Sequence, residues 1–237
     1  MSLQQLKQEL KQAANPEKAK DLQRFFKTGK GEYAEGDIFL GIQVPITRQI
    51  IKNHFNLTYQ ELAELLNSKF HEERLSALLI LNQKFKKAKK DHKERYYIYN
   101  FYLKNTKGIN NWDLVDLSAP NIPGEFLFKN QDQSMLRHLA QSQNIWERRI
   151  AILSTLAFIK NRKFGESLAI AKMLLNDEHD LIHKAVGWML REIGKRNQEV
   201  LETFLNQNYK TMPRTMLRYA IEKFPEDLRQ KYLKGEI

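Results

Sequence analysis

The chain of 237 residues contains no cysteine. This absence excludes disulfide bonds, thiolate metal sites, iron–sulfur clusters and cysteine nucleophiles together. A cysteine-free chain fits a reducing compartment, and we expect a cytoplasmic protein.

Proline and glycine are also scarce, with 6 and 10 residues, whereas hydrophobic residues make up 42% of the chain. That balance predicts a packed core and not a disordered chain. No stretch approaches the roughly 18 consecutive apolar residues of a membrane span, and the N-terminal segment MSLQQLKQELKQAANPEK lacks the apolar centre of a signal peptide. We therefore expect a folded protein that neither spans a membrane nor carries a standard export signal.

Acidic residues are the minority among the charged side chains. The 28 Asp and Glu residues face 39 Lys and Arg residues, which gives a formal net charge of +11. An excess of positive charge of this size favours a polyanionic partner.

Apolar residues recur with helical spacing along most of the chain, and no segment shows the alternation of a strand. Pro16 and Pro45 stand at helix-opening positions, and Thr58 and Glu61 have the spacing of a capping box. Residues 28–37 form the one long irregular segment. Two predicted helices open at Pro45 and Thr58, and the others cover residues 2–14, 17–27, 72–89, 93–104, 111–118, 124–129, 134–141, 145–160, 166–176, 182–196, 199–206, 214–223 and 226–233.

One sequence pattern repeats at a fixed period. Arg149, Lys184 and Arg218 are each followed by small and apolar residues, and they are 35 and 34 residues apart. Arg74 opens a similar pattern 75 residues before Arg149, about two periods upstream. The missing copy should fall near residue 112, where Trp112 begins the sequence WDLVD. A period of this length is typical of repeat proteins built from helix pairs.

The repeat selects a fold class. The Trp, Leu-Gly and Tyr landmarks of tetratricopeptide repeats are absent, which favours HEAT-like repeats, although the period is shorter than usual for them. We predict an all-α, right-handed α-solenoid of HEAT-like helix pairs that forms a single domain over residues 1–237. The concave surface of such an array is the usual binding face, and here it should be basic.

The repeated cations are candidates for phosphate contacts. A single Lys or Arg on a solenoid helix is usually a solvated surface residue, but recurrence in register predicts a stripe of positive charge, which is typical of a surface that binds phosphates. The basic run at residues 84–95 covers the end of one predicted helix and the start of the next. We interpret it as a solvated surface whose charge attracts a polyanion only at long range. The candidates in the stripe are Arg74, Arg149, Lys184, Arg191 and Arg218.

Trp112 and Asp116 are four residues apart, so they share one face of a predicted helix. One interpretation is a helix start, with acidic residues in the first turn and a core Trp. Asp116, however, lies beyond the first turn between Val115 and Leu117, where a carboxylate calls for a functional reason.

Trp188 lies in an apolar helical run, where an aromatic residue usually belongs to the core. Gly187 beside it predicts a close backbone approach, because a glycine inside a helix costs about 1 kcal/mol relative to alanine.

Two further motifs are weak. His179 and His183 have the spacing of a zinc motif, but Asp replaces its Glu base and no third ligand is evident, so no metal site is predicted. The segment from Gly29 to Gly31 has neither a preceding strand nor the spacing of a phosphate-binding loop, so no nucleotide site is predicted.

Six segments spread over nearly the whole chain match one known family. They are 25–33 (FFKTGKGEY), 39–45 (FLGIQVP), 112–116 (WDLVD), 144–149 (NIWERR), 184–192 (KAVGWMLRE) and 212–221 (MPRTMLRYAI). In these segments the chain resembles the AlkD-type family of bacterial DNA alkylation repair glycosylases, which are HEAT-like repeat proteins. The resemblance implies a monofunctional enzyme that hydrolyses the N-glycosidic bond of cationic N3- and N7-alkylated purines in duplex DNA, without base flipping.

The resemblance also implies roles for individual residues. Asp116 would be the catalytic carboxylate, Trp112 and Trp188 would contact the sugar of the damaged nucleotide, and Arg149 would bind the neighbouring phosphates. The matched segments add Phe25, Lys27 and Gln43 as DNA contacts. Relatives often carry Tyr where this chain has Phe25, so a hydroxyl contact is lost while the ring is kept.

Chemistry agrees with this assignment. An alkylated purine already carries positive charge, so it leaves without a general acid, and a carboxylate stabilises the sugar cation that remains. We therefore predict no cofactor, double-stranded DNA containing alkylated purines as the partner, and a monomer that associates with the nucleoid during repair. The alternatives are a non-catalytic protein of the same fold that recognises damaged or branched DNA, and, more weakly, a protein scaffold.

Overall fold

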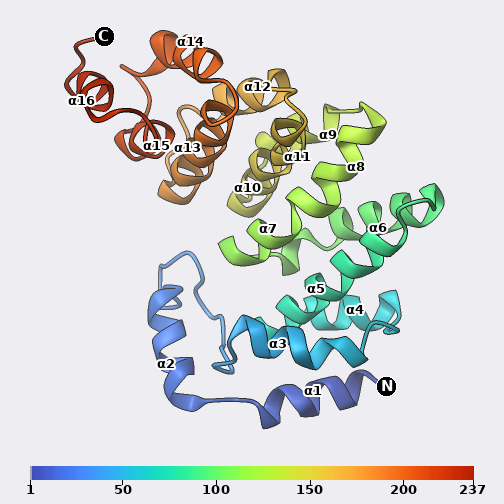
Figure 1. Cartoon of the computed structure of the whole chain (residues 1–237). Helices are drawn as coiled ribbons and strands as arrows, with labels where there is room; N and C mark the ends of the chain where they lie inside the picture. Colours follow the sequence, from blue (N-terminus) through green and yellow to red (C-terminus); the bar gives the residue numbers. More distant parts are fainter. Residues whose placement is uncertain (1) are drawn as a thin grey trace. The chain divides into compact units, whose positions relative to one another are not determined.

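The structure is a computed structural model that describes residues 2–237. These residues form α-helices joined by turns and by one long loop between α2 and α3 (Figure 1), so the all-α prediction is confirmed. Within the described residues the only strand-like pairing is an isolated parallel bridge between Ile38 and Phe70. No helix in the described part of the chain is both long enough and apolar enough to cross a bilayer.

The chain divides into two compact units, and the division follows Ser118. The prediction of one domain over residues 1–237 stays a prediction. The first unit contains α1 (Leu3–Gln12), α2 (Pro16–Phe25), α3 (Val44–Ile50), α4 (Tyr59–Leu66), α5 (His71–Lys87), α6 (His92–Lys104) and α7 (Trp112–Ser118). The second contains a π-helical turn (Pro120–Gly124), α8 (Glu125–Asn130), α9 (Ser134–Ala140), α10 (Ile145–Ser154), α11 (Leu156–Lys160), α12 (Gly165–Met173), α13 (Asp180–Gly194), α14 (Gln198–Asn208), α15 (Arg214–Ala220) and α16 (Glu226–Lys234).

Side-chain caps begin several helices. The capping box of Thr58 and Glu61 at the start of α4 is confirmed. Asn15 caps α2 by accepting hydrogen bonds from two backbone N–H groups, directly before Pro16. His179 caps α13, where its Nδ1 accepts a hydrogen bond from the N–H of Leu181 at 3.1 Å. These caps satisfy N–H groups that have no partner inside their own helix.

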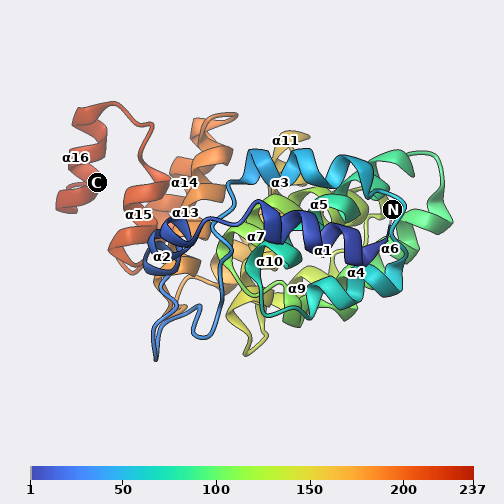
Figure 2. The ribbon, with the colours of Figure 1, turned by 90° about the horizontal axis from the view of Figure 1, so that it is seen from below.

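Helix α5 is the centre of the first unit. It packs against α1, α3, α4, α6 and α7 (Figures 1 and 2). Every residue from His71 to Leu81 is buried. A helix that is buried all round needs apolar residues on all of its faces, and residues 75–81 (LSALLIL) largely provide them. The first four residues of α5 are ionisable, and their burial shapes the site described below.

The second unit shows the predicted register of the repeat. Helix α10 packs against α13, and α13 packs against α15. Arg149, Lys184 and Arg218 each occupy the fifth position of their helix. The repeated sequence pattern therefore marks equivalent positions on helices that pack in succession.

The predicted continuous helix over residues 145–160 is wrong, because the chain breaks between α10 and α11 at Thr155. The hydroxyl of Ser154 donates to the carbonyl of Ile150 at 2.6 Å, and that of Thr155 donates to the carbonyl of Ile152 at 2.7 Å. Such bonds from side chain to backbone compete with the regular helical pattern and often bend helices. The hydrophobic periodicity continues through residues 154 and 155, so the sequence pattern did not reveal the break.

The close approach predicted at Gly187 is confirmed, and it gives a stability test. A Cβ atom at this position would lie 2.5 Å from the Cβ of Tyr219 and 2.6 Å from the carbonyl oxygen of Met216. We therefore expect Gly187→Ala to separate α13 from α15 and to lower the free energy of unfolding by about 1–3 kcal/mol, measured by urea denaturation.

Gly165→Ala is the matched control for this substitution. Gly165 is also helical, but nothing lies within 4 Å of an added Cβ. Alanine should leave the stability unchanged or raise it slightly, because it reduces the entropy of the unfolded chain. Equal stability of the two variants would contradict a tight contact between α13 and α15.

Candidate functional site

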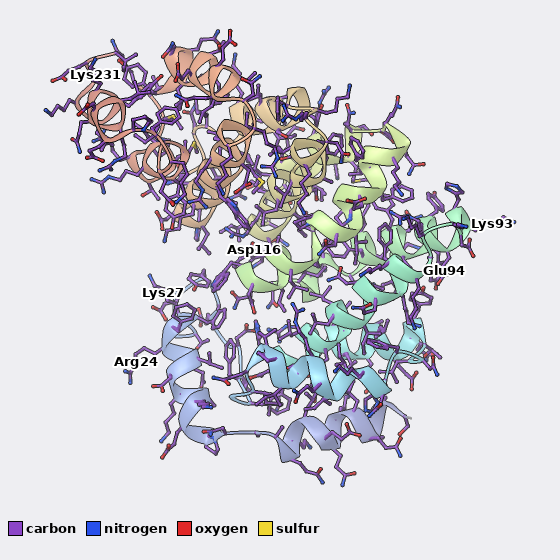
Figure 3. The ribbon with its side chains drawn as sticks, viewed as in Figure 1. Arg24, Lys27, Lys93, Glu94, Asp116 and Lys231 are labelled. Atoms are coloured by element: carbon purple, nitrogen blue, oxygen red, sulfur yellow. The ribbon has the colours of Figure 1, made fainter. Side chains whose placement is uncertain are left out.

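The first turn of α7 positions the pair that the sequence singles out. The side chain of Asn111 accepts a hydrogen bond from the N–H of Trp112 at 2.8 Å, which begins the helix. Leu114 and Val115 point into the core, so Trp112 and Asp116, one turn apart, share the partly exposed side of α7. Figure 3 labels Asp116 on this helix. An aromatic ring and a carboxylate thus lie near each other on an accessible surface.

The charge of Asp116 also acts on the core. Burial of Tyr102 and the negative charge of Asp116 together raise the pKa of the Tyr102 hydroxyl. That hydroxyl lies 2.9 Å from the hydroxyl of Ser118 at the end of α7. The Tyr102 hydroxyl therefore stays neutral and able to donate a hydrogen bond.

The ring of Trp112 is held by two consecutive aromatic residues at the end of α2. Phe26 stacks on Trp112 with ring centroids 5.1 Å apart and planes 14° apart. Phe25 meets Trp112 edge to face at 6.0 Å and is 64% exposed. Phe26 also stacks on Phe39, and Phe39 stacks on the ring of His71. Aromatic pairs in these arrangements contribute about 0.5–1.5 kcal/mol each beyond the area that they bury.

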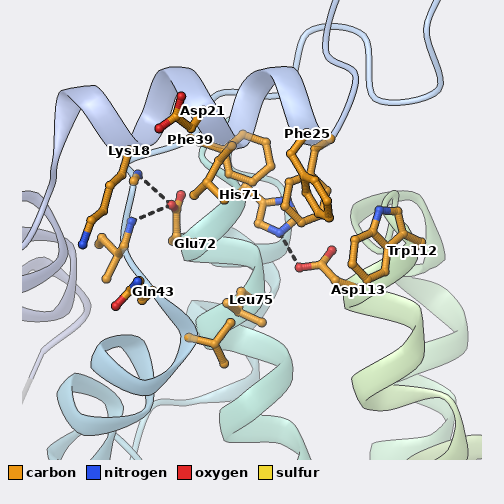
Figure 4. A pocket seen from close by; sticks show the side chains of 15 residues that line it. Lys18, Asp21, Phe25, Phe39, Gln43, His71, Glu72, Leu75, Trp112 and Asp113 are labelled. Atoms are coloured by element: carbon orange, nitrogen blue, oxygen red, sulfur yellow. Dashed lines mark hydrogen bonds and ion pairs between the residues drawn. The ribbon is translucent and has the colours of Figure 1, made fainter.

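These rings border a cavity of about 530 Å³ within the first unit (Figure 4). Its walls come from α2, the segment 39–44, the start of α5 and the start of α7. Of the predicted site residues, Phe25, Gln43 and Trp112 meet here, whereas Asp116 and Lys27 do not line this cavity. Lys27 and Gln43 are both exposed, and Lys27 adopts a positive φ of 54° just after α2 (Figure 3).

A buried charge network lies behind the cavity. His71 is placed between two carboxylates, with its Nε2 2.8 Å from Asp113 and its Nδ1 3.3 Å from Asp37. Arg74 donates to the second oxygen of Asp37 at 2.5 Å and to the carbonyl of Ser68 at 2.8 Å. The network therefore joins the loop before α3, the start of α5 and the start of α7.

The network shifts two pKa values. Burial opposes the protonation of His71, but the charge and hydrogen bond of Asp113 and the bond to Asp37 outweigh it and raise the pKa of His71 to about 9. Burial likewise opposes the ionisation of Asp37, but the bond to His71 and the charge of Arg74 outweigh it and lower the pKa of Asp37. His71 is accordingly a cation at neutral pH, and its neighbours Asp37 and Asp113 neutralise it.

Glu72 fixes another wall of the cavity. Its carboxylate accepts hydrogen bonds from the N–H groups of Leu40, Gly41 and Ile42 at 2.8, 2.9 and 3.1 Å. Gly41 has a φ of 83°, and a Cβ there would lie 2.1 Å from the carbonyl oxygen of Asn15, so only glycine fits. The segment that leads into α3 is thus held between α2 and α5.

The prediction that Arg74 belongs to an exposed basic stripe is wrong. Its side chain is 3% exposed because it pairs with Asp37 inside the network. Sequence reasoning also missed His71, Asp37 and Glu72. The signal was present, since four ionisable residues (HEER) open a helix whose next turns are apolar on all sides. Such a helix must be buried, and buried charges require partners.

In the second unit, Trp188 lies on the partly exposed side of α13 between two cations. Lys184, Trp188 and Arg191 follow one another along that side, one turn apart. Lys184 pairs with Asp180 at 2.7 Å, and Arg191 pairs with Glu222. An aromatic ring flanked by cations is a suitable surface for a nucleic-acid backbone.

The other two cations of the second unit differ in exposure. Arg218 is exposed on α15. Arg149 is 5% exposed, and its guanidinium donates to the carbonyl of Leu181 at 2.5 Å. Arg149 therefore stabilises the packing of α10 on the start of α13, whatever else it contacts. Among the described residues, no cluster of three or more His, Cys, Asp or Glu side chains is arranged to hold a metal ion.

A family model described as "DNA alkylation repair enzyme" matches residues 6–224. A solved structure described as "Predicted DNA alkylation repair enzyme from Enterococcus faecalis" is similar with a TM-score of 0.67 and 18% sequence identity, over 90% of this chain and 97% of that chain. At this identity the likeness shows the fold alone. The curated proteins include no match to the chain.

The charge of His71 predicts how stability depends on pH. The pKa of His71 rises from 6.5 in the unfolded chain to about 9 in the folded chain, so its contribution is complete below pH 6.5 and is lost as the pH rises through 9. We expect urea denaturation to show a decrease in the free energy of unfolding of roughly 3 kcal/mol between pH 6.5 and pH 9.5. His71→Asn should be less stable at pH 6.5 and should lack this dependence.

His92→Asn is the control for this measurement, because His92 is exposed in the same unit. It should keep the pH dependence of the wild type. If the free energy of unfolding of His71→Asn depends on pH as it does in the wild type, the network does not hold His71 as a cation.

Proposed function

Because the chain belongs to the family of DNA alkylation repair enzymes, we propose that it is a monofunctional DNA glycosylase. Its substrates are cationic N3- and N7-alkylated purines in duplex DNA, such as 3-methyladenine and 7-methylguanine. The observation that carries this proposal is the placement of Asp116 and Trp112 one turn apart on the partly exposed side of α7. The reaction requires no cofactor.

The proposed fold is a HEAT-like solenoid of helix pairs with a basic concave face. Two observations support it, each within one unit. Helix α5 packs against α7, and α10, α13 and α15 pack in succession. The cations at the fifth position of these last three helices support a structural repeat, and two of them, Lys184 and Arg218, are at least partly exposed. Repeat arrays of this kind present extended binding surfaces to elongated ligands such as duplex DNA.

The chemistry follows from the charge of the damaged base. Alkylation at N3 or N7 leaves the purine cationic, so the bond to C1′ breaks with both electrons moving to the base, which departs neutral. The sugar becomes an oxocarbenium-like cation, and the Asp116 carboxylate stabilises it. A water molecule then adds to C1′ and loses a proton. No general acid is needed at any step.

The aromatic residues assist the same step. The faces of Trp112 and Trp188 carry negative quadrupole charge, which attracts a sugar that is becoming positive, by about 0.5–2 kcal/mol. The backbone is held by the cations on α13 and α15. Because the atom that becomes cationic and takes up water, C1′, belongs to the sugar, the enzyme approaches from the backbone and the base need not be flipped for cleavage. Phosphate contacts position the duplex without reading its sequence.

The sharpest test is Asp116→Asn. This substitution keeps the size of the side chain and removes its charge, so the fold should survive. We expect the release of 7-methylguanine under single-turnover conditions to slow by roughly 10- to 1,000-fold, as for loss of one preorganised electrostatic partner. Binding of DNA should hold or improve, because a negative charge near phosphates is removed. Equal rates for variant and wild type would favour a non-catalytic DNA-binding protein.

Asp113→Asn is the matched control, three residues away on the same helix. Asp113 is the ion-pair partner of His71. Its substitution should therefore lower the thermal stability more than it lowers the cleavage rate. A loss of rate in Asp113→Asn equal to that in Asp116→Asn would remove the special role of Asp116.

DNA binding should be electrostatic. We expect a plot of log K against log salt to fall with a slope of several units, about −0.9 for each phosphate neutralised. Arg218→Ala should weaken binding to damaged and undamaged duplex alike. It should also make the slope shallower by about 0.9, the contribution of one phosphate contact. Lys231→Ala, which removes an exposed cation from α16, is the control and should leave the slope unchanged. An effect of Arg218→Ala on only one DNA sequence would mean that this residue reads bases.

A further inference from the structure

The cavity of the first unit has an aromatic mouth, and the proposed cleavage reaction uses only Trp112 of the rings that form it. Phe25 is 64% exposed and Val44 is 40% exposed, and both line the cavity. Apolar side chains left exposed at the rim of a concave surface indicate contact with an apolar ligand. Figure 4 shows the rings of Phe25, Phe39 and Trp112 around this space.

The polar groups deep in the cavity are already paired. Both oxygens of Glu72 accept backbone hydrogen bonds. One oxygen of Asp113 faces His71 and the other accepts from the N–H of Leu114. Both ring nitrogens of His71 face carboxylates. The inner wall is therefore closed to hydrogen bonding and offers stacking surfaces instead.

The charges around the cavity disfavour an anion. Asp21, Glu72 and Asp113 contribute three negative charges, and Lys18 and protonated His71 contribute two positive charges. A phosphate group would meet no net attraction there. A neutral or weakly cationic planar group would meet no repulsion.

We propose that this cavity binds a single purine base, which stacks on the ring of Phe25 and meets the ring of Trp112 edge to face, because the two rings are 71° apart. A volume of about 530 Å³ lies within the range of roughly 300–1,000 Å³ that is usual for small-molecule sites. Stacking of a base on an aromatic ring contributes about 1–3 kcal/mol and tolerates any base, since each has a π-face. Gln43 at the rim is positioned to contact the edge of the base.

This proposal rests on the proposed function, which supplies the ligand. The base is either the free alkylpurine released by cleavage or an unpaired base turned out of the duplex. The two sources share the same planar heteroaromatic chemistry, and separate experiments distinguish them.

The first experiment measures the free base. Equilibrium dialysis of the full chain against radiolabelled 7-methylguanine should show saturable binding at one site. Val44→Trp places an indole at the mouth and should weaken this binding at least tenfold. Ile46→Trp is the matched control, because Ile46 is 38% exposed on the same helix but does not line the cavity, and it should bind within twofold of the wild type.

The second experiment measures an unpaired base. A duplex carrying 2-aminopurine opposite an abasic-site analogue should show quenching of 2-aminopurine fluorescence on binding, as expected for a base stacked on aromatic rings. Val44→Trp should abolish the quenching and keep the affinity for DNA, whereas Ile46→Trp should behave as the wild type. Quenching without binding of free base assigns the site to a turned-out base, and the reverse assigns it to the released product.

Absence of both signals in the wild type would overturn the proposal, as would signals that Val44→Trp does not reduce. Circular dichroism melting of both Trp variants checks that they fold. The outcome is separable from that of the proposed function, because release of 7-methylguanine from duplex DNA is assayed independently. Cleavage without binding of a base in the cavity would contradict only the proposed base site. Binding of a base without cleavage would contradict only the proposed glycosylase activity.

Discussion

Burial of four consecutive ionisable side chains at the start of α5 is the constraint on which the first unit depends. Each buried charge must find a partner, because an unpaired one destabilises a fold by several kcal/mol. Those partners come from three other segments. His71 reaches Asp113 on α7, and Glu73 lies 4.0 Å from Lys7 on α1. Arg74 and Glu72 both reach the loop before α3, at Asp37 and at the backbone of residues 40–42. Trp112 begins the helix that the His71–Asp113 pair anchors, so the same charges fix the position of its ring.

Much of the fold was predictable because its causes are local. Helical periodicity and the caps at Thr58 and before Pro16 depend on residues within one turn of each other. The glycine at position 187 predicted a close helix contact for the same reason. The break at Thr155 was not predicted, since two small hydroxyl groups alter the backbone without altering the apolar pattern.

The candidate site was predictable only in part. The spacing of Trp112 and Asp116 is a local signal, and so is the spacing of Lys184, Trp188 and Arg191. The charge network and the cavity are not local, because their residues come from four segments as far apart as α2 and α7. The recurrence of a cation predicted the register correctly in α10, α13 and α15 but not in α5 and α7, and it predicted exposure wrongly at Arg74 and Arg149. Arg74 satisfies a buried carboxylate from a loop that lies outside the repeat, and the period of the sequence carries no information about that partner.

The carboxylate of Glu72 occupies a potential anion site of the backbone. Three successive backbone N–H groups that converge on one point form a nest of the kind that binds phosphate in other proteins. Here the anion is the Glu72 carboxylate of the chain itself, so its effective concentration at those donors is high. The Glu72 carboxylate occupies this nest and connects α5 to residues 40–42. The N–H groups of residues 40–42 are therefore not available to an anion from outside the chain.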